Sequence, residues 1–116
     1  MLKISIKNED GKIHEYSVHE IENILKNLKV RFGNGFFPLA NNVEKLHKGS
    51  ERLGLGRMIL EQRPADIYHA QGSSYLGVVM EECGYFEWNG IRRGIEWCLI
   101  DSDFSTNTII SKLKNV

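Results

Sequence analysis

Apolar and polar residues alternate over positions 2–7, where leucine and isoleucine occupy every even position. A period of two residues is typical of a strand that buries one face. Turn-forming residues at 8–11 separate this run from a second β-rich run, Ile13 to Tyr16. The pattern predicts that the chain opens with a β-hairpin.

The period then becomes that of an α-helix. Ser17 and Glu20 form a capping box, in which the serine accepts a hydrogen bond at the start of a helix, and Tyr16 and Ile21 can form the hydrophobic staple around it. The apolar stripe that follows consists of Val18, Ile21, Leu25 and Leu28. We therefore expect a helix that begins just after Ser17.

Two glycines, a proline and three phenylalanines follow within 31–39, which predicts a structured loop with its phenylalanines packed on the core. Short helices are predicted from Asn41 or Asn42 to Gly49, over 55–62 and over 65–71. A last short helix should begin after Asp103 or Ser105. Its apolar side would carry Ile109, Ile110 and Leu113.

Residues 73–100 hold the clearest pattern. Apolar residues at helical spacing predict a helix over about 74–83, with Ser73 or Ser74 as its cap and Gly84 as its left-handed end. Gly77 in its middle costs about 1 kcal/mol relative to alanine, so we expect a close packing neighbour there.

A β-hairpin is predicted next, because Asn89-Gly90 suits the two positive-φ positions of a type I′ turn. A two-residue loop sets the following cross-strand pairs: Trp88 with Ile91, Glu87 with Arg92, Phe86 with Arg93, and Tyr85 with Gly94. The apolar face would then carry Phe86, Trp88, Ile91, Ile95, Trp97 and Leu99. The other face would carry Glu87, Arg92, Glu96 and Cys98.

The order of elements over residues 50–100 resembles the winged helix-turn-helix superfamily: a helix at 55–62, a short helix at 65–71, a tight turn at Gly72-Ser73, a helix at 74–83 and a wing at 85–100. The run Met80 to Phe86 (MEECGYF) is similar to the joint between helix and strand in that superfamily. Gly94 followed by Ile95, Trp97 and Leu99 resembles its returning wing strand.

These patterns together predict an α+β fold within a single domain, 1–116, since 116 residues suffice for one core. Residues 1–49 would form a β-hairpin, a helix and the phenylalanine-rich loop. Residues 50–100 would form the winged-helix-like part, and 101–116 the C-terminal helix.

The resemblance implies that the second helix of the motif enters a DNA major groove while the wing touches the backbone or minor groove. The residues that would contact DNA are Ser73, Ser74, Tyr75 and Val78 on the helix and Asn89, Arg92 and Arg93 on the wing. Serine, tyrosine and arginine can donate to phosphates or base edges.

Charge weakens this interpretation. The net charge is zero, and acids outnumber arginines by seven to five over 50–100, with Glu81 and Glu82 on the same helix. Duplex affinity depends on several uncompensated cations. The resemblance keeps a non-catalytic module that binds DNA as the first hypothesis. Because of the charge, a module of the same fold for protein contacts or homodimerisation is the second.

The chain offers little sign of catalysis. The four histidines have no metal-binding spacing, Cys83 fits a small core residue, Cys98 lies within a predicted strand, and no cofactor motif is present. Basic residues exceed acidic ones by eight to three over 26–63. A third hypothesis is accordingly an anionic-ligand site or enzyme that uses Arg31, Asn34, Arg52 and Arg57.

No signal peptide and no apolar run long enough to span a membrane is found in the sequence. The two cysteines lack the spacing of a disulfide framework or of a C-x-x-C motif. We expect a cytoplasmic protein without a membrane partner.

Overall fold

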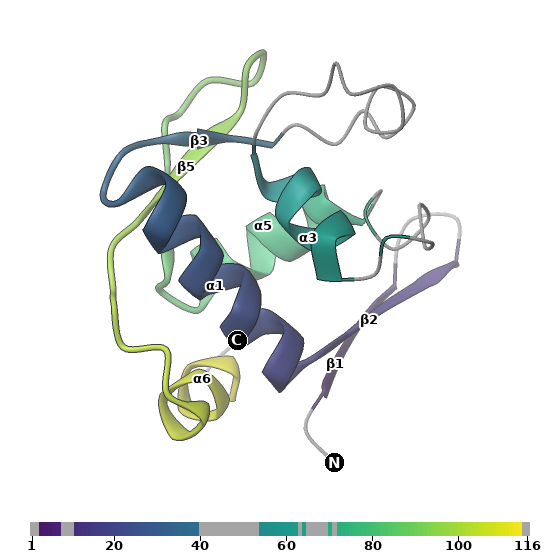
Figure 1. Cartoon of the computed structure of the whole chain (residues 1–116). Coiled ribbons are helices and arrows are strands. Elements are labelled where there is room, and N and C mark those ends of the chain that lie inside the picture. The colour runs from purple at the N-terminus through teal and green to yellow at the C-terminus, as the bar shows by residue number, and fades with distance from the viewer. Residues whose placement is uncertain are drawn as a thin grey trace.

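The computed structural model describes residues 3–7, 11–39, 54–62, 64, 70 and 72–114, which form helices and two antiparallel sheets (Figure 1). The predicted α+β class is confirmed. The predicted helix at 41–49 and residue Arg52 lie outside the described residues, as does almost all of the predicted helix at 65–71.

The expected N-terminal hairpin is present. Strands β1 (Lys3–Lys7) and β2 (Ile13–Ser17) pair antiparallel, with Ile4 opposite Tyr16 and Ile6 opposite His14. These four side chains share the inner face, where the histidine and tyrosine are buried and the isoleucines pack against the core. The alternation in the sequence therefore marks the buried face of the ribbon.

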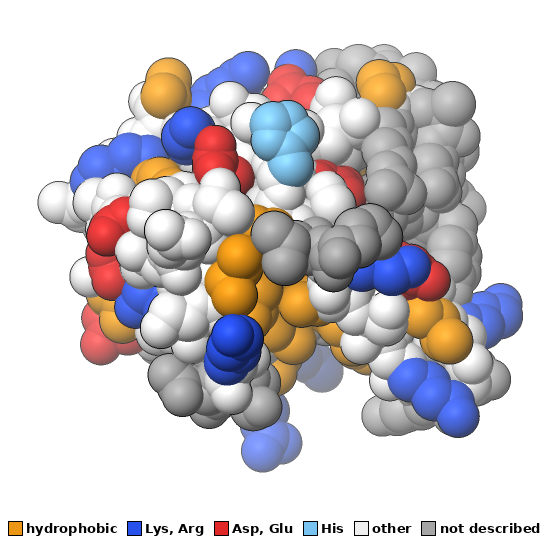
Figure 2. Space-filling view, turned by 90° about the horizontal axis from the view of Figure 1, so that it is seen from below, with side chains coloured by type: hydrophobic (Ala, Val, Ile, Leu, Met, Phe, Trp, Pro, Cys, Tyr) orange, Lys and Arg blue, Asp and Glu red, His pale blue; other side chains and the backbone are white. Residues whose placement is uncertain are grey.

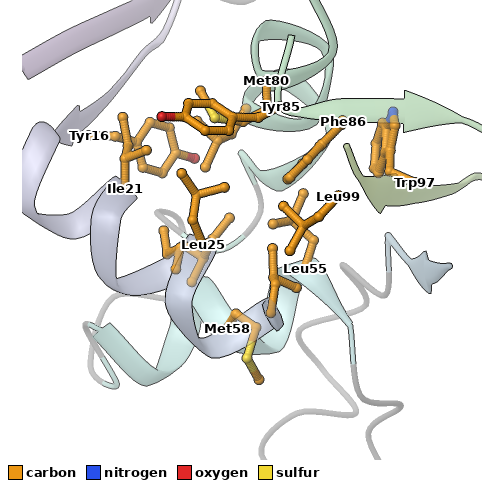
Figure 3. Packing of buried hydrophobic residues seen from close by; sticks show 14 of the residues in the cluster. Tyr16, Ile21, Leu25, Leu55, Met58, Met80, Tyr85, Phe86, Trp97 and Leu99 are labelled. Atoms are coloured by element: carbon orange, nitrogen blue, oxygen red, sulfur yellow. The ribbon is translucent and has the colours of Figure 1, made fainter. Parts of the chain in front are cut away.

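Helix α1 (Val18–Phe32) begins at the predicted cap, where Ser17 Oγ accepts a hydrogen bond from the Glu20 N–H at 3.0 Å. Tyr16 and Ile21, the two residues of the predicted hydrophobic staple, are both buried in the same cluster (Figure 3). α1 runs through the middle of the molecule and contacts β2, α3 (Leu55–Gln62) and α6 (Thr106–Leu113) (Figure 1). It is the element around which the core is assembled.

The second sheet has the order β3-β5-β4, formed by β3 (Phe37–Pro38), β5 (Glu96–Leu99) and β4 (Phe86–Trp88). The region predicted as a structured loop supplies β3, because Phe37 pairs with Trp97. The Phe37 side chain is fully buried, but Phe36 is 47% exposed. The expected burial of every phenylalanine in this region is therefore wrong for Phe36.

The predicted register of the β4–β5 hairpin is wrong. Phe86 pairs with Leu99, Glu87 with Cys98 and Trp88 with Trp97, so a longer loop replaces the two-residue turn. The shift amounts to an even number of residues, which keeps Phe86, Trp97 and Leu99 on their predicted face. Phe86, Trp97 and Leu99 consequently reach the core, where burying each stabilises the fold by about 1.5–3 kcal/mol. Ile91, predicted on the same face, lies in the loop and is 54% exposed, and Cys98, predicted on the solvent face, is buried.

Helices α3 and α6 complete the core. α3 spans its predicted range and buries Leu55, Met58 and Ile59. Ser105 is the N-cap of α6, where its Oγ accepts a hydrogen bond from the Thr108 N–H, and the helix buries Ile109. Within the part of the chain that the structure describes, no helix has the length and apolar content needed to cross a membrane.

Candidate binding site between helix α5 and the hairpin

Helix α5 (Ser73–Glu82) ends in a Schellman motif. The Gly84 N–H donates to the Glu81 carbonyl at 3.2 Å and the Tyr85 N–H donates to the Met80 carbonyl at 2.9 Å, while Gly84 has φ +94°. This pair of bonds satisfies carbonyls that the end of the helix leaves open. Because Tyr85 leads directly into β4, the motif also fixes the angle at which the hairpin leaves the helix.

Gly77 lets the hairpin lie directly on α5. A Cβ atom at position 77 would lie 2.4 Å from Cη2 of Trp97, closer than any side chain tolerates. The close neighbour that the sequence predicted at this glycine is therefore the indole of Trp97. The same indole donates its Nε1–H to Glu81 Oε1 at 3.1 Å, one turn further along α5.

This contact leaves a surface pocket of about 240 Å³ between the helix and the hairpin. Val78 and Glu81 line it from α5, and Trp88, Ile95 and Trp97 line it from the hairpin. Trp97 is almost completely buried, whereas Val78 is 49% exposed and Trp88 is 39% exposed. The pocket thus has apolar walls that face solvent and one carboxylate.

Charges of opposite sign lie on either side of the pocket. α5 carries the exposed Glu81 and Glu82 and has no basic residue. The hairpin loop carries Arg92 and Arg93, both exposed and without an ion pair to another described residue. Figure 2 shows another side of the molecule, seen from below, where acidic and basic side chains are interspersed around hydrophobic ones.

The predicted DNA-contacting residues of the helix differ in their access to solvent. Gly72, not a serine, is the N-cap of α5, so the predicted side-chain cap is absent. Ser73 is fully buried, and its hydroxyl has no hydrogen-bond partner among the described residues. Tyr75 stacks on His14 of β2 with ring centroids 5.6 Å apart, and Ser74 is half-buried. Val78 alone of the four is more than a third exposed.

The predicted wing residues occupy the hairpin loop. Asn89 holds the loop closed, because its Nδ2 donates to the Gly94 carbonyl at 3.1 Å and its Oδ1 accepts from the Ile91 N–H at 3.1 Å. Arg92 lies in the loop and is not opposite Glu87, which instead faces Cys98. The expected pair between Glu87 and Arg92 is therefore wrong.

The predicted anion site is brought together only in part. Arg31 and Arg57 both approach Glu61 Oε1, at 3.4 and 3.8 Å, so one carboxylate offsets both guanidinium groups. Asn34 Oδ1 accepts a hydrogen bond from Lys29 Nζ at 2.7 Å. This arrangement weakens the case for an anionic ligand, since an added anion would compete with Glu61.

Neither cysteine has the surroundings of a nucleophile. Burial raises the pKa of the Cys83 thiol, which donates to the Met80 carbonyl at 3.5 Å. Burial and the neighbouring Glu87 carboxylate raise the pKa of Cys98. Within the described ranges, no cluster of three or more histidine, cysteine or acidic side chains is placed to hold a metal ion.

Sequence reasoning missed the pocket itself. It joins α5 to both strands of the hairpin, and the wrong register hid the pairing of Trp88 with Trp97. The glycine in the middle of α5 was the one signal that pointed to it.

No family model, no curated protein and no solved structure matches this chain.

Proposed function

We propose that this chain is a non-catalytic protein-binding module that uses the pocket between α5 and the hairpin. The observation that carries the proposal is the exposure of Val78 and Trp88 in an apolar pocket with one carboxylate. A hollow lined by apolar side chains with a single polar group is typical of a binding site, and tryptophan is enriched at the centres of protein interfaces.

The same surface suits a protein better than a duplex. α5 presents two glutamates and no cation, although DNA affinity grows with the number of phosphates that lysine or arginine neutralises. The resemblance to a winged helix-turn-helix stays part of the proposal as a scaffold: α3, α5 and the hairpin follow one another in that order, and β3 extends the sheet of the wing. A scaffold of this kind does not dictate its ligand.

The two free cysteines support a reducing, cytoplasmic location.

Selection from a random peptide library displayed on phage tests the proposal without a known partner. Selected peptides should bind wild type and lose at least about tenfold in affinity for Val78→Asp, about 1.4 kcal/mol. Val30→Asp is the matched control, because Val30 is 83% exposed on α1, away from the pocket. Peptides that bind Val78→Asp as tightly as wild type would place the binding surface elsewhere.

Nucleic-acid binding is a second candidate, which the exposed Arg92 and Arg93 favour. A mobility-shift titration of duplex DNA at low salt tests it. If the chain binds DNA, wild type should form a complex whose affinity falls as the salt concentration rises. The Arg92→Ala, Arg93→Ala double variant should form no such complex. Absence of any complex with wild type would rule it out.

A further inference from the structure

The hairpin loop leaves the sheet between two residues of the pocket. Trp88 precedes the loop and Ile95 follows it, and both line the pocket. Between them, residues 91–93 form an exposed tip of sequence Ile-Arg-Arg, in which Ile91 is 54% exposed. An apolar and cationic tip therefore lies beside an apolar pocket with a carboxylate.

The tip and the pocket are chemically complementary. An arginine can stack its guanidinium on an exposed indole while it pairs with a carboxylate. Trp88 offers the indole, and Glu81 uses one oxygen for Trp97 but can accept further hydrogen bonds. Ile91 would find apolar neighbours in Val78 and Ile95.

The tip does not occupy the pocket of its own chain. Asn89 closes the loop through its bonds to Ile91 and Gly94, which keeps the tip compact. Ile91 stays more than half exposed, and the pocket beside it stays open. Both surfaces are consequently available for contact with another molecule.

We infer that the occupant of the pocket is the Ile91–Arg93 tip of a second copy of this chain. The inference rests on the proposed protein-binding function and names its partner. Because tip and pocket adjoin, a two-fold axis beside the hairpin lets each copy insert its tip into the other. Such a contact is self-complementary and closes as a dimer.

Sedimentation equilibrium of the whole chain tests the inference over a range of concentrations. Wild type should form a dimer whose population rises with concentration. Val78→Asp should weaken association at least about tenfold, while Val30→Asp should associate as wild type does. Circular dichroism and thermal melting establish that each variant is folded.

A charge exchange tests the pairing of tip with pocket. In a homodimer of the Arg92→Glu, Arg93→Glu double variant, each acidic tip would meet the Glu81 carboxylate of the other copy. In a homodimer of Glu81→Lys, each arginine tip would meet a lysine in the pocket of the other copy. Each variant alone should be monomeric. Their mixture should form a heterodimer, since both contacts then join opposite charges. Glu81→Gln keeps an acceptor for the Trp97 N–H and separates loss of charge from loss of that bond.

The outcomes distinguish the inference from the proposed function. A chain that is monomeric throughout, yet binds selected peptides through Val78, overturns the dimer and leaves the protein-binding function standing. A monomer for which no Val78-dependent peptide is found overturns both. A dimer that survives Val78→Asp and both charge reversals also overturns the inference, because its interface lies elsewhere.

Discussion

Gly77 of α5 and Trp97 of β5 are packed so closely that the tryptophan ring occupies the space of a side chain at position 77. The nearest ring atom would lie 2.4 Å from a Cβ atom there. Trp97 is 2% exposed and also lies beside Phe86, with ring centroids 6.0 Å apart (Figure 3). The glycine thus brings a core residue of the sheet against the helix and sets one wall of the pocket.

Gly77→Ala should destabilise the fold even though alanine favours a helix by about 1 kcal/mol. The indole would have to move, and overpacking of this kind costs about 1–3 kcal/mol. Urea unfolding measures the change. Val78→Ala in the same helix is the control, and it should change the free energy of unfolding by less than about 0.5 kcal/mol. A Gly77→Ala variant more stable than wild type would contradict the close packing.

Tyr85→Phe should lower stability near neutral pH by about 1 kcal/mol, because the Tyr85 hydroxyl donates to the Asp103 carbonyl at 2.7 Å. Burial, with smaller contributions from nearby negative groups, raises the pKa of Tyr85 well above its usual value. Stability from this group is therefore fully present below about pH 10 and is lost as pH rises from there toward the folded pKa.

Unfolding measured between neutral and strongly alkaline pH should consequently show a smaller alkaline loss in Tyr85→Phe than in wild type. Tyr75→Phe is the control, because it leaves Tyr85 in place and should keep the wild-type loss. Equal alkaline losses in all three chains would show that Tyr85 contributes nothing to the pH dependence.

Local patterns predicted the elements well. The capping box at Ser17 placed the start of α1, and Gly84 placed the end of α5, because both signals act within one helical turn. Phe86, Trp97 and Leu99 share the buried face as predicted, since strand parity does not depend on loop length if the shift is even, whereas the predictions for Ile91 and Cys98 are wrong.

The register and the site depended on contacts distant in sequence. Asn89-Gly90 favours a tight turn. In the structure the Asn89 side chain instead forms hydrogen bonds with Ile91 and Gly94 in a longer loop, and Phe86 pairs with the buried Leu99. Core burial outweighed the turn preference. The sequence did not predict β3 for a related reason: Phe37 and Pro38 form a strand only because they pair with β5, where Phe37 lies opposite Trp97.

Lys112→Met should raise the pKa of Asp101 toward its usual value while changing that of Asp103 less. The Asp103 N–H is the main cause that lowers the Asp101 pKa, and a hydrogen bond from Lys112 at 2.9 Å is the next. The Asp103 pKa is lowered chiefly by the Ser105 N–H, with Lys112 as a minor cause. Carboxyl NMR titration measures both values.

The same shifts set the response to acid. Carboxyl groups with a lowered folded pKa contribute stability that is present above the unfolded value, about 3.9, and lost as pH falls through the folded value. Acid unfolding should therefore involve these two aspartates, and Asp101→Asn should flatten the loss. A Lys112→Met variant in which Asp103 shifts more than Asp101 would contradict this assignment.

Asn89→Ala should loosen the hairpin loop without melting the sheet. The substitution removes the two side-chain bonds that close residues 90–94, at a cost of about 1 kcal/mol, while the Asn89 N–H can still donate to the Glu96 carbonyl at 2.9 Å. Amide hydrogen exchange should accelerate at Ile91 and stay slow at Cys98, which lies opposite Glu87 in the strand pair. If the tip of a second copy fills the pocket, a looser tip should also weaken the dimer, because each association must order it again. Faster exchange at Cys98 would instead show that Asn89 supports the sheet itself and that the loop is not an independent unit.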